Sequence, residues 1–209
     1  SDGPVGSYED FSHADVIVLI GANIADNHPI LNLHIKKNEE ITGKKPTIIV
    51  VDPRYSKTAN MADIFVPINP RSDLALINGL CHIILKEGWQ DKSFIKNRTS
   101  GFEKFETHIM DNYAPKKVAK ITGIKEEDLY NLAKTYAKAK SAMSAWTMGV
   151  NQSSIGTDTV SSICNLALIT GNLGRKGASP MSITGQCNAM GTRETGFTSS
   201  IPGYRNFHD

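Results

Sequence analysis

Two short segments with almost uninterrupted apolar side chains, Val16–Ile20 and Thr47–Val51, constrain the fold of this chain more than any other feature. Such runs are typical of strands buried on both faces, as in a parallel sheet covered by helices on each side. Between them, a helix is predicted over residues 29–40, with Asp26 or Asn27 as its N-cap. The sequence therefore predicts a strand–helix–strand unit with a right-handed crossover.

The same alternation continues along the chain. Further strands are predicted over residues 64–68 and 142–150, and further helices over 73–87 (capped by Asp73), 126–140 and 157–170. Residues 91–124 are predicted to form short helices and loops, and no regular element is predicted after Gly171. The predicted fold class is α/β, a doubly wound, mostly parallel, Rossmann-like sheet with helices on both faces. Residues 1–175 are expected to form the domain, and residues 176–209 a truncated loop segment that lines its pocket.

Composition excludes several classes of function. The net charge is +2, and no Lys/Arg cluster is interleaved with aromatic residues, so nucleic acid is not a predicted partner. The longest apolar runs fall far below the ~20 residues of a membrane span. The three cysteines are widely spaced, without a CxxC pair, so no metal site is predicted in this chain. Cysteine usage favours a reducing, cytoplasmic compartment, with a periplasmic one left open.

Four polar segments, each following a predicted strand, are expected to converge on one crevice. They comprise residues 21–27, 52–58, 69–73 and 148–156. The first segment lacks GxGxxG, so the usual NAD fingerprint is absent, although its tight turn and following helix suit a phosphate.

Individual residues in these segments have both a functional and a structural interpretation. Asp52 is placed to accept from ribose hydroxyls or to form a turn before Pro53, and Arg54 to lie along a diphosphate or purine or in solvent. Asp73 is able to accept from the N1–H and exocyclic amine of guanine, or simply to cap its helix. Met148 and Gln152 flank Gly149, where the backbone can approach a ring closely.

The segment 184–194 is polar throughout, with Gln186, Asn188, Arg193 and Glu194 and almost no apolar residues. It cannot be core, because its amide and charged groups would need buried partners. The sequence contains no evident Ser/His/Asp or Cys/His arrangement and no carboxylate pair suited to acid–base work. Any chemistry is therefore expected to come from a cofactor.

Seven short motifs occur in an order and spacing that resembles one family. They are Gly-Ala-Asn-Ile-Ala-Asp-Asn-His-Pro (21–29), Val-Asp-Pro-Arg (51–54), Ala-Asp (62–63), Asn-Pro-Arg-Ser-Asp (69–73), Trp-Thr-Met-Gly-Val-Asn-Gln (146–152), Thr-Gly-Asn-Leu-Gly (170–174) and Gly-Gln-Cys-Asn-Ala-Met-Gly (185–191). Together they resemble the third domain of the prokaryotic molybdopterin oxidoreductases. That domain is Rossmann-like and holds one guanine dinucleotide arm of the cofactor Mo-bis(molybdopterin guanine dinucleotide).

The resemblance implies a role for each matching residue. The cofactor's phosphates would lie at Gly21, Ala22, Asn23 and Ile24, its ribose near Asp52 and Arg54, and its guanine at Asp73. The pterin would contact Met148 and Gln152, with Gln186 and Asn188 lining the pocket near the metal. Arg193 would be the catalytic arginine that attracts and orients nitrate.

Within the family, nitrate reductase is favoured over formate dehydrogenase. Formate dehydrogenases typically carry Arg where this chain has Thr184, and Asn where it has Cys187, whereas Arg193-Glu194 resembles nitrate reductases. The neighbourhood of Tyr204 resembles formate dehydrogenases and keeps that alternative open. Two other readings are a non-catalytic iron–sulfur scaffold, as in NADH dehydrogenase, and a plain guanine-nucleotide module; the polar crevice residues and the lack of a phosphate-binding lysine argue against them.

The implied reaction is reduction of nitrate to nitrite by oxygen-atom transfer at molybdenum, with electrons from a donor protein or subunit. The family's [4Fe–4S] cluster and its metal ligand would be held by upstream sequence, and a C-terminal pterin domain would follow. This chain is therefore expected to be a fragment that is inactive alone and carries no metal ligand.

Overall fold

A computed structural model describes residues 5–196, 202 and 205 of the chain. Its centre is a five-stranded sheet with the order β3-β2-β1-β4-β5. Every neighbouring pair of strands is parallel. The strands are β1 (Val16–Ile20), β2 (Thr47–Val51), β3 (Ile64–Val66), β4 (Ala142–Trp146) and β5 (Pro180–Ser182). The predicted doubly wound α/β fold is thus confirmed, with the reversal of strand order between β1 and β4.

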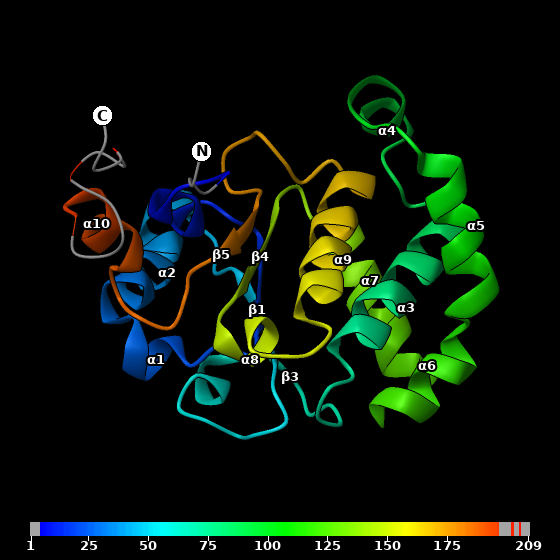
Figure 1. Ribbon diagram of the computed structural model, residues 1–209, viewed down its shortest axis with the longest axis horizontal. Coiled ribbons are helices and arrows are strands. Elements are labelled where there is room, and N and C mark those ends of the chain that lie inside the picture. Colours follow the sequence, from blue (N-terminus) through cyan, green and yellow to red (C-terminus); the bar gives the residue numbers. More distant parts are fainter. Residues whose placement is uncertain (1–4, 197–201, 203–204, 206–209) are drawn as a thin grey trace.

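Helices cover both faces of the sheet (Figure 1). One face carries η1 (Tyr8–Ser12), α1 (Ile24–Asn27) and α2 (Pro29–Thr42), with α10 (Ala189–Glu194) at the same end of the molecule. The other face carries α3 (Asp73–Lys86), α7 (Glu126–Lys138) and α9 (Gly156–Ile169). α5 (Phe102–Asn112) and α6 (Pro115–Thr122) pack outside α3, and α4 (Lys92–Arg98) packs against α9. Two short helices, η2 (Ala59–Met61) and α8 (Met148–Asn151), lie in strand-end connections.

The apolar runs of the strands divide their side chains between two cores, because successive strand residues point to opposite faces. In β1, Val16, Val18 and Ile20 belong to the core under α3, α7 and α9. Ile17 and Leu19 belong to the core under α2 and η1. All five residues are at most 7% exposed, as expected for a strand buried on both faces.

Two predicted strands are shorter in the structure. β3 ends at Val66, because Pro67 lacks the N–H that would continue the ladder. β4 ends at Trp146, and residues 148–151 form α8 rather than strand. At this turn the hydroxyl of Thr147 donates to the carbonyl of Gly21 at 2.6 Å.

The two helix caps also differ from prediction. A first helical turn, α1, forms before the predicted cap, with Asn23 as N-cap, and the chain breaks at His28 before α2 begins at Pro29. The break arises because a residue before proline avoids the helical conformation. Ser72, rather than Asp73, is the N-cap of α3, and Asp73 is its first residue, where a carboxylate still favours the positive end of the helix dipole.

The expectation that regular structure ends after Gly171 is wrong. β5 pairs with β4 at the edge of the sheet, and α10 follows it. β5 was missed because it is only three residues long and begins with Pro180, a residue tolerated only at strand starts and edges. α10 was missed because its exposed polar residues carry no apolar periodicity. None of the helices in the described part of the chain is long and apolar enough to cross a membrane.

Candidate functional site

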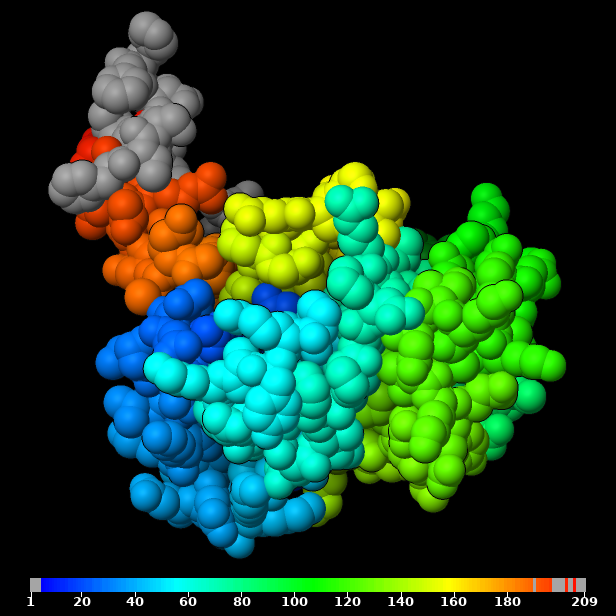
Figure 2. Space-filling view, turned by 90° about the horizontal axis from the view of Figure 1, so that it is seen from below, coloured from blue at the N-terminus to red at the C-terminus, as the bar shows by residue number. Residues whose placement is uncertain are grey.

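A crevice opens at the carboxyl ends of the strands, at the reversal of strand order. Its cavity has a volume of about 490 Å³. It is lined by Gly21, Asn23, Asn27, Asp52, Pro53, Arg54, Ile68, Pro70, Arg71, Asp73, Thr147, Gly149, Gln152, Ser153 and Ser154. These residues include members of all four segments that the sequence predicted to converge, together with Ile68 and Thr147 just before two of them. In Figure 2, blue atoms of the segment after β1 lie between cyan atoms of the segment after β2 and yellow atoms of the segment after β4.

Two glycines form the closest backbone contact in this crevice. The amide of Gly149 donates to the carbonyl of Gly21 at 3.2 Å. A Cβ added at Gly149 would lie 2.6 Å from that carbonyl oxygen, and one added at Gly21 would lie 2.9 Å from the Cα of Gly149. Gly21 also has a φ of +53°, in the left-handed region. Side chains are therefore excluded here, and main chain faces any ligand.

Two carboxylates share the crevice. The Oδ1 of Asp52 accepts from the backbone amide of Arg54 at 2.8 Å, which is the turn geometry that the sequence offered as its structural interpretation. Asp73 is partly buried in the first turn of α3, and burial raises the pKa of its carboxyl. The nearby charge of Asp52 raises this pKa further, against the lowering effect of a backbone amide. A ligand that donates hydrogen bonds to Asp73 would stabilise the ionised carboxylate, which burial and the charge of Asp52 disfavour.

Two arginines line the same crevice. Arg54 is exposed, and it was predicted to lie there. Arg71 was not singled out from the sequence, although it lies within the segment 69–73 that was predicted to line the crevice. Its φ of +66° is uncommon for a residue with a side chain and marks a strained position of the kind that clusters at ligand sites.

The predicted phosphate segment contributes mainly backbone to the site. Ala22 and Ile24 are 1% and 0% exposed, so their side chains belong to the core. The side chain of Asn23 accepts from the Thr58 hydroxyl at 2.9 Å and donates to Asp26 at 2.9 Å. The bond with Thr58 fastens α1 to the loop after β2, and the bond with Asp26 lies within the first turn of α1, so the Asn23 side chain has structural partners.

Two of the remaining predicted residues, Gln186 and Asn188, line a second cavity of about 310 Å³. It is lined by Gly6, Ser7, Tyr8, Met181, Ser182, Ile183, Thr184, Gln186, Cys187, Asn188 and Ala189, and we call it the loop cavity. Met148 lines neither cavity, and its side chain lies against the loop, since a Cβ added at Gly185 would meet its Cγ at 2.9 Å. Arg193 lies in the last turn of α10 and lines neither cavity. Tyr204 lies outside the described residues.

The described residues contain no group of three or more His, Cys, Asp or Glu side chains placed to hold a metal ion. The crevice instead offers carboxylate acceptors, guanidinium donors and a glycine floor. This set of groups fits a ligand that combines anionic groups with a flat, hydrogen-bonding ring.

Comparison with known proteins identifies the family. A model of the molybdopterin oxidoreductase family matches residues 5–207, and the chain belongs to this family. It is 44% identical to a nitrate reductase of Synechocystis sp., over 99% of this chain and 29% of that protein. It is 40% identical to the alpha subunit of an F420-dependent formate dehydrogenase of Methanocaldococcus jannaschii, over 100% of this chain and 31% of that protein.

A solved structure shares the fold. Acetylene hydratase from Pelobacter acetylenicus superposes with a TM-score of 0.72 at 27% identity, covering 80% of this chain and 23% of that one. The chain spans less than a third of the length of the relatives that it matches. Membership of the family implies a molybdenum–pterin cofactor.

Proposed function

We propose that this chain binds one guanine dinucleotide arm of Mo-bis(molybdopterin guanine dinucleotide) within an enzyme that reduces nitrate to nitrite. The observation that carries the proposal is the crevice, in which Asp52, Arg54 and Asp73 surround the floor formed by Gly21 and Gly149. The glycine floor lets a phosphate or ribose approach the main chain, and the carboxylates accept from sugar hydroxyls and a base.

Asp73 supports guanine as the base. A carboxylate has two acceptor oxygens, which match the adjacent N1–H and exocyclic amine of guanine. Adenine presents an acceptor at N1, so the same carboxylate would face an acceptor and lose a bond. Because buried polar groups left unpaired are costly, this mismatch disfavours adenine by about 1–3 kcal/mol.

Nucleotide binding to the chain itself tests this part of the proposal. Titration calorimetry with GDP and ADP should show binding of GDP and at least about fivefold weaker binding of ADP. Asp73→Asn should abolish the preference, since the amide nitrogen cannot accept. The matched control is Asp158→Asn, an exposed aspartate in the first turn of α9, which should leave GDP binding unchanged. Equal affinity for GDP and ADP in the unchanged chain would contradict the assignment.

Arg193 supports nitrate as the substrate. When bound, the molybdenum centre supplies two-electron oxygen-atom exchange, with electrons from a donor protein through a [4Fe–4S] cluster held by sequence outside this chain. Arg193 is a cation that remains charged at every physiological pH and presents several N–H donors to a planar anion. We propose that α10 carries it toward the substrate pocket.

Formate oxidation is the second candidate, supported by the identity to the Methanocaldococcus jannaschii protein. Viologen-linked assays of the complete, molybdenum-loaded enzyme separate the two. Nitrate-dependent oxidation of reduced viologen is expected, with Arg193→Gln raising the KM for nitrate by about tenfold or more. Arg98→Gln, on the exposed end of α4, is the control. Formate-dependent viologen reduction without nitrate activity would refute the nitrate proposal.

A further inference from the structure

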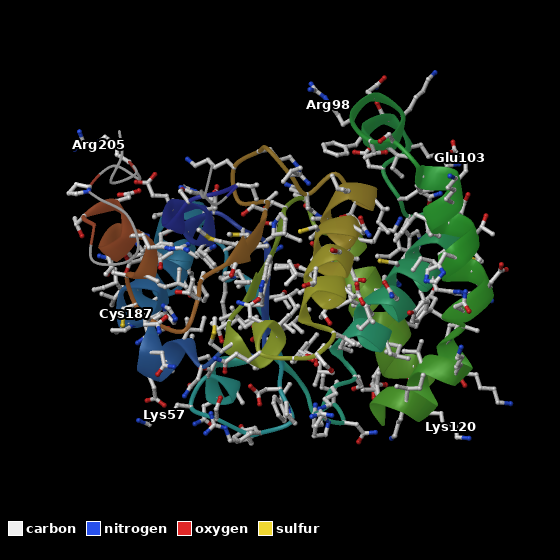
Figure 3. The ribbon with its side chains drawn as sticks, in the orientation of Figure 1. Lys57, Arg98, Glu103, Lys120, Cys187 and Arg205 are labelled. Carbon is white, nitrogen blue, oxygen red and sulfur yellow. The ribbon has the colours of Figure 1, made fainter. Side chains whose placement is uncertain are left out.

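Two hydrogen bonds join the loop 184–188 to the junction between α1 and α2. The Nε2 of His28 lies 3.1 Å from the carbonyl oxygen of Thr184. The thiol of Cys187 donates to the carbonyl oxygen of Asn27 at 2.8 Å. Figure 3 shows Cys187 beside the helices of this junction, far along the sequence from either of them. We call residues 27–28 the junction.

The chemistry of His28 fixes its protonation state. Its side chain is 2% exposed, and because a carbonyl oxygen only accepts, the proton must lie on Nε2. Burial lowers the pKa of the His28 imidazole, against the opposing effect of the bond to Thr184. The ring is therefore a neutral donor. Its Nδ1 is buried without a hydrogen-bond partner among the described residues, so the bond from Nε2 is the one hydrogen bond of this ring in the described part of the chain.

The loop needs such external bonds because its own backbone is strained. Thr184 has a φ of +58°, in the left-handed region that β-branched residues rarely adopt. Strain of this kind persists only where neighbouring structure holds it in place. The carbonyl that follows this φ is the one that accepts from His28.

The junction also lies between the two cavities. Asn27 lines the crevice, while the loop that its carbonyl holds lines the loop cavity with Gln186 and Asn188. We infer that His28 is a positioning residue, which holds the loop 184–188 against the junction and so fixes the placement of Gln186 and Asn188 relative to the crevice. Its importance for catalysis rests on the proposed function, whereas its effect on the loop does not.

Limited proteolysis of the chain tests the inference directly. Cleavage by thermolysin before Ala189, mapped by mass spectrometry, reports the population of the open loop when opening is fast. His28→Leu removes the donor and leaves the Thr184 carbonyl unpaired. We expect cleavage to rise about five- to tenfold, the factor expected from losing one buried hydrogen bond. His28→Gln, whose amide can donate in the same direction, should restore protection.

Asn38→Leu is the matched control, because Asn38 lies in α2 and is also buried. It donates to the carbonyls of Phe11 and Ala14 rather than to the loop. This variant should lower the midpoint of urea unfolding without selective cleavage before Ala189. If His28→Leu were to behave in the same way as Asn38→Leu, the histidine would be structural only, and the inference would fail.

Cys187 gives a second variant that keeps the chain folded, because its side chain is exposed. Cys187→Ala should also raise cleavage before Ala189, and Cys187→Ser, which retains a donor, should not. Combined with His28→Leu, it should show an effect smaller than the product of the single effects, since both bonds hold one loop. Independent, fully multiplicative effects would overturn the inference. GDP binding measured in parallel separates this outcome from failure of the proposed function.

Discussion

Replacement of Gly149 by alanine tests the contact that forms the floor of the crevice. The new Cβ would lie 2.6 Å from the carbonyl oxygen and 2.7 Å from the Cα of Gly21. The two backbones must move apart to remove these short contacts, because neither contacted atom belongs to a flexible side chain. Separation would weaken the bonds that the amide of Gly149 and the hydroxyl of Thr147 donate to this carbonyl.

The size of the effect follows from three contributions. Overpacking costs about 1–3 kcal/mol, and each of the two weakened hydrogen bonds about 1 kcal/mol. The better helix propensity of alanine within α8 offsets about 1 kcal/mol. We therefore expect the free energy of unfolding to fall by about 2–4 kcal/mol, which lowers Tm by about 5–15 °C for a chain of this size.

Urea unfolding followed by circular dichroism measures the loss, with an unchanged m-value as the sign that the unfolding transition is the same. The control is Gly43→Ala, where φ is +74° and no atom lies within 4 Å of the added Cβ. Gly43→Ala measures the cost of a positive φ alone, about 1–2 kcal/mol. Gly149 has no positive φ, so Gly149→Ala measures the cost of the short backbone contact. A loss at Gly149 no larger than that at Gly43 would refute the reasoning.

Three further predictions concern buried or paired polar groups. The pKa of the Asp73 carboxyl is raised above its ordinary value of 3.8, so its ionisation destabilises the folded chain as pH rises above that value. Asp73→Asn should therefore stabilise the chain at pH 7 but not at pH 3. Urea titrations at both pH values would show this difference. Tyr136→Phe removes the acceptor for the buried Ser144 hydroxyl and should cost about 1–3 kcal/mol; adding Ser144→Ala should recover most of this loss, and a strictly additive further loss in the double variant would contradict the pairing. Burial raises the pKa of Asp63, but the Ile48 amide and the Lys45 ammonium outweigh burial and lower this pKa overall. The stability that the Asp63 carboxylate contributes should be present above pH 3.8, its ordinary pKa, and be lost as pH falls below that value. An Asp63→Asn chain with the same acid unfolding curve would count against this.

The layered fold was predictable because its strands carry an unusually strong signal. β1 and β2 coincide with the two apolar segments, and side chains alternating between two cores must all be apolar. The weaker elements depend on tertiary context. β5 exists only because β4 offers it a paired edge, and the break at His28 depends on the proline that follows it.

The candidate site was predictable only in outline. The rule that ligands bind at the carboxyl ends of parallel strands predicts from the sequence alone that four segments share one crevice. The rule does not specify which side chains face inward, so Arg71 was missed and the engagement of Asn23 with Thr58 was not foreseen. Nor does spacing show that Gln186 and Asn188 line a separate cavity, because that depends on two hydrogen bonds to the junction.

The glycine floor has a consequence for how this crevice can change during evolution. Its floor is main chain, and any substitution at Gly21 or Gly149 meets backbone at under 3 Å, so these two positions have almost no sequence freedom. The rim residues Asp52, Arg71 and Asp73 contribute side chains from two separate segments, one after β2 and one leading into α3. Rim residues can be replaced one at a time without moving the floor. Under the proposed function, the choice of base would be open to gradual substitution, whereas the place where the dinucleotide meets the backbone would be fixed by the fold.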